Sequence, residues 1–390
     1  MELNLLDIVS ILYSFAAIIL IVFLLSSSSQ RPLSNILLSF YFFFSILDAA
    51  SQFVSYFIYP KHPIIGFIIS ETVFFIMPFF YLFVKSSVYR DFKLTKSSIL
   101  HLAPYIIVNI IFIPGYFVPL LADESTDWVS LIYDTHLVSF MYISIHTQIF
   151  LYFFLIYRLL FRYKKLLLEN YSSSKLNNYK WLMQLVSVFF ISDLISTLKN
   201  YIRFNSNENL YWISTTFVSV LALCIIFWLI IKALKNPQLF TGVNIEMQLV
   251  KDMVKEETKL HSLDSATLKV SDGEHAELVL VLQNHMKKNE PYLDSSLSIY
   301  ELAKQLNVNT RDLSIAINHD LNKHFFDFVN EYRINKAMEI IRNSDDEKLT
   351  ILEVLYDVGF NSKSSFNTAF KKHTGLTPTE FKNKTTLSVA

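Results

Sequence analysis

The sequence predicts an all-α protein in two parts, a seven-span transmembrane helical bundle followed by a cytoplasmic domain with two helix-turn-helix units. Two observations support this fold class. Residues 1–235 hold seven long apolar stretches and only 28 charged side chains, 16 basic and 12 acidic. The last 155 residues hold 40 charged side chains, 18 basic and 22 acidic, and a helical pattern that occurs twice. Such a change of composition along one chain indicates separate domains.

Seven apolar stretches are long enough to cross a bilayer, because about 20 helical residues span the ~30 Å hydrocarbon layer. The first stretch does not resemble a cleaved signal peptide, since acidic Glu2 and Asp7 flank it where basic residues are typical. Asp48 interrupts the second stretch and Asp193 the sixth. The predicted spans are residues 5–25, 34–58, 64–84, 99–120, 135–160, 181–200 and 211–231.

The distribution of Lys and Arg predicts how the bundle is oriented. Alternate loops hold 13 basic residues against 3, and the basic loops of a membrane protein face the cytoplasm. The loop at 158–180 is rich in Lys and Arg, whereas the loop "ADESTDW" at 122–128 has none. The C-terminal side belongs to the richer set. We therefore expect a multi-pass protein of a bacterial inner membrane, with its N-terminus outside and its C-terminal domain in the cytoplasm.

Five polar side chains fall near the middles of predicted spans. A charge at this depth costs at least ~2.5 kcal/mol on insertion scales, so such groups usually face the bundle interior. One interpretation is a polar pocket that detects an unknown signal ligand or membrane partner. The other is interhelical hydrogen bonding that only fixes the packing. The candidate sensing residues are Asp48, Glu71, His146, Gln148 and Asp193.

The sequence predicts no enzyme, no metal site and no cofactor. It has no His/Glu metal motif on one helix, no Gly-rich phosphate loop and no nucleophile elbow. The single cysteine, Cys224, excludes a disulfide framework and a cysteine metal site.

Residues 236–272 form a predicted linker. Asn236 and Pro237 end the seventh span, because proline cannot continue a helix. Beyond them, Ile245, Leu249 and Met253 lie on one face of a short amphipathic helix. This pattern fits a plain spacer, and it also fits a signalling helix that pairs two chains in a homodimer. The sensor domain would then cover 1–235.

The C-terminal part repeats one pattern of two helices. "LSIYELAKQLNVNTRDLSIAI" at 297–317 and "LTILEVLYDVGFNSKSSFNTAF" at 349–370 both begin with a capping box and continue with apolar residues at helical spacing. In a capping box, a hydroxyl and a carboxylate each satisfy a backbone N–H that has no partner inside the helix. The boxes pair Ser298 with Glu301 and Thr350 with Glu353.

A tight turn joins the two helices of each copy. Asn307 and Gly359 suit the positive φ that this turn requires. Asn309 and Asn361 are the predicted N-caps of the second helices. The second copy has one extra residue between its turn and its core. The second helices are expected to bury Leu313, Ile317, Phe366 and Phe370.

The stretch between the copies, "FFDFVNEYRINKAMEIIRN" at 325–343, has the spacing of one long helix that packs against both units. After the second copy, Gly375 ends a helix. Thr377, Pro378 and Glu380 then begin another, with proline at its first position and a third capping box.

Together, "ELAKQLNVNTRDLSIAI", "FVNEYRINKAMEII", "VGFNSKSSFNTAFKK" and "TGLTPTEFK" resemble the DNA-binding domain of the AraC/XylS family of bacterial transcription regulators. The resemblance runs from about 274 to 384, and we assign the domain to 273–390. It implies a seven-helix domain whose two reading helices enter successive major grooves of promoter DNA, about 34 Å apart. It also implies RNA polymerase as a partner.

The outward positions of the two reading helices are the candidate DNA-binding residues. Arg311 suits guanine and Ile315 a thymine methyl group, and Lys371 and Lys372 suit phosphates. The alternative is a solvated helix face. The first helix contributes Thr310, Arg311, Ser314 and Ile315, and the second contributes Lys363, Ser364, Asn367, Thr368, Lys371 and Lys372.

The charge of this domain is low for a DNA-binding protein. Residues 274–390 hold 14 basic and 16 acidic side chains, a net charge of −2, although 361–384 hold five Lys against one Glu. We therefore expect weak non-specific binding and a shallow dependence on salt.

Two functions follow from the sequence. The first is a membrane-anchored regulator that couples a signal to promoter binding. The second is a transporter or receptor whose helical tail binds another protein, with Asp48, Glu71 and Asp193 serving proton coupling. The second leaves the repeated motif unexplained, so the first is preferred.

Overall fold

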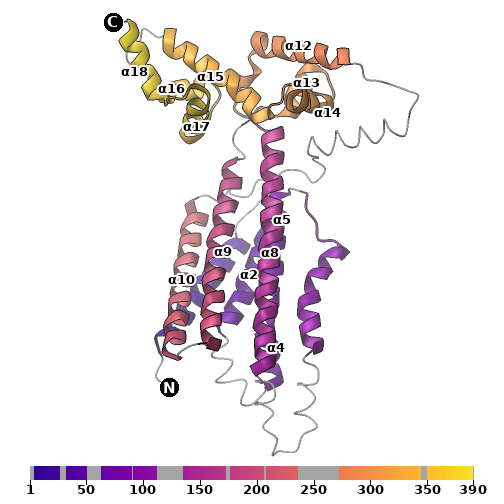
Figure 1. Cartoon of the computed structure of the whole chain (residues 1–390), viewed down its shortest axis with the longest axis vertical. Helices are drawn as coiled ribbons and strands as arrows, with labels where there is room; N and C mark the ends of the chain where they lie inside the picture. Colours follow the sequence, from indigo (N-terminus) through magenta and orange to yellow (C-terminus); the bar gives the residue numbers. More distant parts are fainter. Residues whose placement is uncertain are drawn as a thin grey trace, which may run out of the picture. The chain divides into compact units, whose positions relative to one another are not determined.

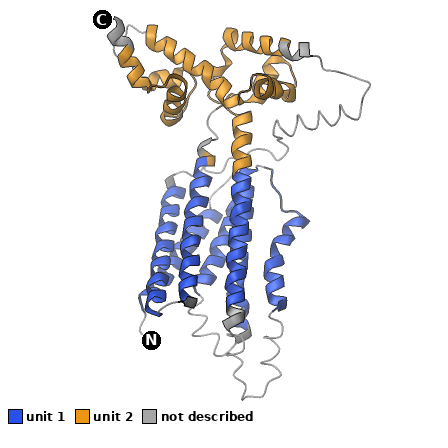
Figure 2. Cartoon of the chain, in the orientation of Figure 1, with its two compact units in different colours: residues 1–160, 180–245 blue, residues 161–179, 246–390 orange. Residues whose placement is uncertain are grey.

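The computed structural model describes residues 4–26, 32–50, 63–89, 91–111, 135–172, 176–205, 208–235, 272–343 and 349–389. Every regular element in these ranges is helical, as the all-α prediction requires (Figure 1). The chain divides into two compact units, which Figure 2 colours separately. Unit 1 comprises residues 1–160 and 180–245, and unit 2 comprises residues 161–179 and 246–390.

Unit 1 contains the apolar helices. Its α-helices and short 3-10 segments follow one another in this order: α1 (Leu5–Ser26), α2 (Pro32–Ala49), α4 (Pro63–Glu71), η1 (Thr72–Phe75), α5 (Ile76–Val88), η2 (Lys96–Leu102), α8 (Thr135–Asn170), α9 (Leu176–Asn205) and α10 (Glu208–Lys235). The last turns of α8 and the first residues of α9 belong to unit 2.

Five helices in the described residues are long and apolar enough to cross a membrane. They correspond to the first, third, fifth, sixth and seventh predicted spans: Leu5–Ser26, Ile68–Val88, Ser139–Asn170, Asn178–Arg203 and Glu208–Leu234. The second and fourth spans begin as the shorter apolar helices Leu33–Ala49 and Lys96–Ile111. Their remaining residues lie outside the described part of the chain, so the count of seven stays a prediction.

Aromatic side chains fill the middle of unit 1. The ring of Phe80, on α5, is fully buried. Its centroid lies 5.2 Å from that of Tyr41 on α2, 5.1 Å from that of Phe189 on α9 and 6.4 Å from that of Phe153 on α8. Such pairs each contribute about 0.5–1.5 kcal/mol beyond their burial. One aromatic cluster thus joins four helices.

Unit 2 contains the repeated motif. Its elements are α12 (Asp272–Asn289), η3 (Pro291–Leu293), α13 (Ile299–Leu306), α14 (Thr310–Ile315), the π-helical turn η4 (Ala316–Asp320), α15 (Phe325–Asn343), α16 (Ile351–Asp357), α17 (Lys363–Thr374) and α18 (Pro378–Val389). The predicted amphipathic linker helix lies outside the described residues.

The predicted long helix α15 connects two separate cores. Phe325, Phe328 and Val329, in its first half, pack with α12, α13 and α14. Ile334 and Ala337, in its second half, pack with α16 and α17. At 1.5 Å per residue, its 19 residues are about 28 Å long. One helix therefore holds both helix-turn-helix units.

The predicted helix ends are confirmed with one exception. All three capping boxes are formed, Asn307 and Gly359 have φ of 54° and 84°, and Gly375 ends α17 at φ 77°. The prediction for Asn361 is wrong, because Ser362 is the N-cap of α17 and accepts a hydrogen bond from Ser365 N. The extra residue of the second copy moves the cap by one position.

Candidate DNA interface and sensing cavity

The first helix-turn-helix unit presents the start of α14. The Oδ1 atom of Asn309 accepts a hydrogen bond of 2.8 Å from the backbone N of Arg311, which begins the helix. Thr310 and Arg311 are partly exposed at this end. Leu313 and Ile317 are buried in the first core, as predicted.

The expectation that Ser314 and Ile315 face solvent is wrong. Only 2% of Ser314 and 5% of Ile315 is exposed. Residues 313–317 are all buried, so more than one full helical turn is covered and this stretch has no outward face. Here Asn318 Nδ2 donates to Ser314 O at 2.9 Å and to Ser314 Oγ at 3.4 Å. The solvent-facing candidates of the first unit are therefore reduced to Thr310 and Arg311.

The second unit presents a longer surface. All six predicted residues lie on the 12-residue helix α17. Asn367 is partly exposed, and the other five are exposed: Lys363, Ser364, Thr368, Lys371 and Lys372. The hydroxyl of Thr368 donates to Ser364 O at 2.8 Å. Lys372 Nζ lies 2.6 Å from Asp327 Oδ1 on α15, so its charge is partly compensated.

The turn of the second unit packs against backbone. Gly359 adopts φ 84°, and a Cβ atom at this position would lie 2.5 Å from the carbonyl oxygen of Leu293. No other residue type combines this φ with so close an approach. The following residue, Phe360, is buried in the second core. The turn is thus fixed against η3.

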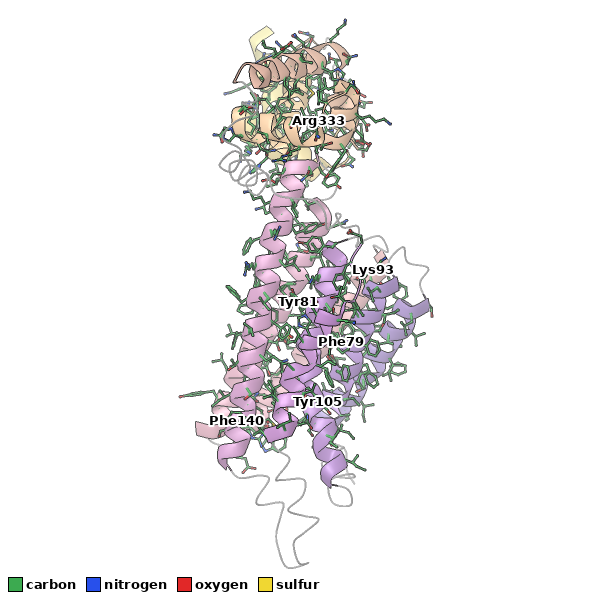
Figure 3. The ribbon with its side chains drawn as sticks, turned by 90° about the vertical axis from the view of Figure 1, so that its right-hand side faces the viewer. Phe79, Tyr81, Lys93, Tyr105, Phe140 and Arg333 are labelled. Atoms are coloured by element: carbon green, nitrogen blue, oxygen red, sulfur yellow. The ribbon has the colours of Figure 1, made fainter. Side chains whose placement is uncertain are left out.

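A buried arginine, which the sequence analysis missed, lies between the two cores. Arg333 of α15 is fully buried, and Figure 3 labels it within unit 2. Burial lowers its pKa to about 10, so the guanidinium is charged at neutral pH and requires acceptors. Its Nε donates to Tyr292 O at 2.6 Å and its Nη2 to Asp294 O at 2.7 Å. Its Cζ lies 5.5 Å from the ring centroid of Phe360.

Two of the five predicted sensing residues take part in hydrogen bonds between helices. The ring nitrogens of His146, on α8, are 3.0 Å from Thr197 Oγ1 and 3.0 Å from Asn200 Nδ2, both on α9. Gln148 Nε2 donates to Phe74 O at 3.0 Å. These contacts favour the packing interpretation for His146 and Gln148.

The three predicted carboxylates have different surroundings. Glu71 is fully buried at the end of α4, and neither of its side-chain oxygens has a hydrogen-bond partner in the described residues. Asp48 lies in the last turn of α2 and is exposed. Asp193 lines a cavity in unit 1.

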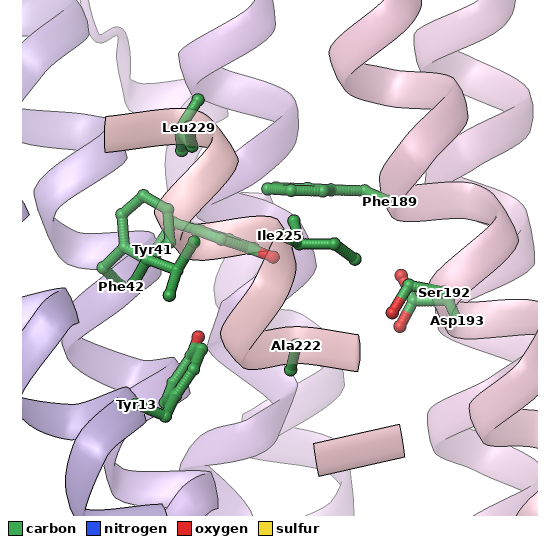
Figure 4. A pocket seen from close by; sticks show the side chains of 10 residues that line it. Tyr13, Tyr41, Phe42, Phe189, Ser192, Asp193, Ala222, Ile225 and Leu229 are labelled. Atoms are coloured by element: carbon green, nitrogen blue, oxygen red, sulfur yellow. The ribbon is translucent and has the colours of Figure 1, made fainter. Parts of the chain in front are cut away.

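This cavity lies between α1, α2, α9 and α10 (Figure 4). Its volume is about 70 Å³. Four aromatic side chains line it, two of them tyrosines with a phenolic hydroxyl, and Asp193 lies beside Ser192 at one side. The sequence predicted only Asp193, because its three-dimensional neighbours come from distant helices. The lining residues are Tyr13, Tyr41, Phe42, Phe189, Ser192, Asp193, Ala222, Ile225, Ile226 and Leu229.

Comparisons with known proteins agree with the geometry of unit 2. The family model of a helix-turn-helix domain matches residues 302–384. An uncharacterised HTH-type transcriptional regulator in the cgkA 5′ region of Pseudoalteromonas carrageenovora is 31% identical over 130 residues, which are 32% of this chain and 73% of that protein. The chain belongs to the AraC family of helix-turn-helix transcription regulators.

Two further similarities cover parts of the chain. The Msm operon regulatory protein of Streptococcus mutans is 28% identical over 90 residues, which are 23% of this chain and 31% of that protein. The C-terminal domain of AraT, a response regulator from Geobacillus stearothermophilus, is 27% identical and covers 27% of this chain and 84% of that domain, with a TM-score of 0.24. The matches to the helix-turn-helix domain and to the Pseudoalteromonas regulator support a DNA-binding regulator, and not the alternative of a protein-binding tail.

Proposed function

We propose that this AraC-family protein is a membrane-anchored regulator, in which unit 1 detects a signal and unit 2 binds double-stranded promoter DNA. The five long apolar helices carry the membrane part of the proposal. Their outward side chains are apolar: 63% of Phe15, 63% of Phe154 and 67% of Ile213 is exposed. A lipid environment suits such a surface, whereas water would favour its association.

The length of α8 supports the proposed topology. Its 36 residues are about 54 Å long, and about 20 residues are enough to cross a bilayer. The helix therefore extends beyond the hydrocarbon layer. The basic segment 161–179, which includes the last turns of α8, shares a compact unit with the DNA-binding helices. Both the basic charge and this grouping favour the cytoplasm for unit 2.

We assign direct base contacts to Arg311, Lys363 and Asn367, whose side chains have donors for base edges. Thr310, Ser364 and Thr368 flank them, and Lys371 and Lys372 contact phosphates. RNA polymerase is the proposed partner at the promoter, and a homodimer formed through 236–272 is the proposed assembly. The proposed boundaries remain 1–235, 236–272 and 273–390, with 161–179 added to the DNA-binding unit.

The cavity beside Asp193 is the proposed sensing site. A carboxylate and the phenolic hydroxyls of Tyr13 and Tyr41 suit a small ligand with a basic or hydrogen-bond-donating group, because aromatic faces attract cations. Asp48 and Glu71 are the other two proposed carboxylates of the sensing part, whereas His146 and Gln148 are assigned to packing between helices.

DNA binding by the intact chain tests the regulator function. We expect the protein in lipid nanodiscs to bind DNA from upstream of its own coding sequence more tightly than scrambled DNA. Arg311→Ala and Lys363→Ala should each reduce this preference by about 1–3 kcal/mol. Lys287→Ala, an exposed basic residue of α12, is the matched control. Equal binding of all variants to both DNA fragments would contradict the proposal.

A reporter fused after Ala390 tests the topology. The proposal requires a cytoplasmic signal from this fusion and an external signal from a fusion before residue 4. A C-terminal reporter that is active only outside the cytoplasm would exclude DNA binding in the cell.

A further inference from the structure

We propose that the turn at the end of α8, Tyr171–Ser172, docks on the DNA-binding unit and is held there by Arg333. Through this turn, movement of α8 would reach both helix-turn-helix units. The inference rests on the proposed function, because it names the route by which unit 1 would regulate DNA binding. All residues of this contact belong to unit 2.

Ser172 hydrogen-bonds to a backbone carbonyl and to the Arg333 guanidinium. Its side chain is buried. Its hydroxyl donates to Leu297 O at 2.7 Å and accepts from Arg333 Nη2 at 3.2 Å. Its carbonyl oxygen accepts from Arg333 Nη1 at 3.4 Å. A hydroxyl is suited to this position because it donates and accepts at the same time, which alanine cannot do.

The contact touches the first helix-turn-helix unit at its N-cap. Tyr171 and Ser298 form an isolated antiparallel β-bridge. Ser298 caps α13, and its backbone N and hydroxyl both bind Glu301 Oε2, at 2.7 Å and 2.9 Å. The turn after α8 is therefore joined to the residue that begins the first unit.

The same arginine reaches the second unit. Besides Ser172, Arg333 binds the carbonyl oxygens of Tyr292 and Asp294, which flank Leu293. The carbonyl oxygen of Leu293 is the atom that would clash with a Cβ atom at Gly359. A displacement of Ser172 would thus change the contacts of the η3 backbone, against which the second turn packs.

The path back to α8 contains no break. α8 is continuous to Asn170, and Tyr171 N donates to Leu167 O at 3.0 Å, so the helical hydrogen-bond pattern reaches the turn. Lys165 and Glu169 form an i,i+4 ion pair of 3.7 Å on its last turns. Movement of the end of α8 is therefore passed directly to Ser172.

A disulfide tests whether the contact exists in the membrane-bound protein. Paired residues of an antiparallel bridge have Cα atoms about 4.5–5.5 Å apart, within the range of a disulfide. In a Cys224→Ser background, Tyr171→Cys with Ser298→Cys should lose both free thiols after mild oxidation of membrane vesicles. The two single cysteine variants serve as controls and should keep theirs. Two reactive thiols in the double variant would overturn the proposal.

DNA binding by the intact chain tests whether the contact matters. Ser172→Ala removes two hydrogen bonds, which leaves η3 less fixed, so we expect operator affinity to fall by about three- to tenfold. Ser172→Thr keeps the hydroxyl and should restore the affinity. Arg333→Met should cause a larger loss. Unchanged affinity of Ser172→Ala would overturn the proposal even if the disulfide forms.

The two proposals fail differently. If the wild-type chain shows no preference for its upstream DNA, the regulator function is wrong. If the wild type binds selectively but the disulfide does not form, or Ser172→Ala binds equally well, only the docking inference is wrong. Since Ser172 lies outside the helix-turn-helix motif, its substitution tests the docking even if Arg333→Met does not fold.

Discussion

The two helix-turn-helix units have the same plan but different outer surfaces. In the first, α14 has six residues, and two of them that were expected to face outward, Ser314 and Ile315, are buried. In the second, α17 has 12 residues and exposes Lys363, Lys371 and Lys372. The matched positions Ile315 and Thr368 differ most, since one is buried and the other exposed.

This difference suggests that the two units contribute to DNA binding in different ways. The first has few exposed donors and is integrated with the Tyr171–Ser172 turn through Ser298. The second has the basic helix that suits phosphates. We therefore expect the first unit to depend on its packing and the second on its charge, and the following predictions test that division.

The largest effect is expected from exchanging the turn residues. Gly359→Asn would force a Cβ atom to within 2.5 Å of Leu293 O. We expect it to destabilise unit 2 by about 3 kcal/mol or more and to abolish operator binding. Asn307→Gly should be tolerated, because glycine accepts the φ of 54° found there. Thermal unfolding and DNA binding of the intact chain measure both.

If Asn307→Gly were harmful and Gly359→Asn were tolerated, the turns would not differ in the way that their packing indicates.

The matched positions on the reading helices give the next largest effect. Ile315→Ala removes a buried side chain and should destabilise the protein by about 2–5 kcal/mol. Thr368→Ala changes an exposed position and should leave stability within about 0.5 kcal/mol. Denaturant unfolding of the purified protein measures the difference. If Ile315→Ala changed base preference without changing stability, our original assignment of Ile315 to the DNA surface would be restored.

Local sequence signals predicted much of unit 2. Capping boxes, positive-φ turn residues and helical spacing depend on residues within a few positions, so Ser298, Thr350, Asn307 and Gly359 were correctly assigned. Ile315 was not, because it lies in a run of five buried residues, 313–317, that is covered on every side. Helical spacing predicts one buried face and contains no sign that the opposite face is also covered.

Long-range contacts were beyond the sequence. Arg333 follows Val329 and precedes Ala337 by four residues, so it lies on the apolar face of α15, and this spacing was a signal that it is buried. Its partner Ser172 is 161 residues away, and no local pattern connects them. The cavity around Asp193 is similar, because α1, α2, α9 and α10 meet there only in three dimensions.

A smaller effect is expected at the ion pair of Lys372 and Asp327. Exposed pairs of this kind contribute about 0.2–1 kcal/mol. Asp327→Asn should leave stability nearly unchanged but release Lys372 for a phosphate, which strengthens DNA binding by a few fold. Lys372→Ala should flatten the log–log dependence of affinity on salt by about 0.9.

Affinity measured over a range of salt concentrations separates these effects, with Lys371→Ala as the control that does not involve Asp327. If Lys372→Ala left the salt dependence unaltered, Lys372 would serve only to hold α17 against α15.

The smallest effect is expected at the cap of α16. Hydrogen bonds from the backbone and hydroxyl of Thr350 lower the pKa of Glu353 below its usual 4.5. The folded state therefore holds the carboxylate ionised more readily than the unfolded state, and the stabilisation is complete above about pH 4.5 and lost as the pH falls through the lower folded value. Glu353→Gln keeps an acceptor in the capping box but has no charge to lose.

Hydrogen exchange of the α16 amides in the intact protein measures this difference. After correction for intrinsic rates, we expect wild-type protection to decrease as the pH falls below about 4.5, and that of Glu353→Gln to change less. Because the cap is exposed, the change should be confined to α16 and should leave α13 and α14 unaffected. An equal decrease in both proteins would mean that acid acts on the second unit elsewhere, such as at the contacts between α15 and α17.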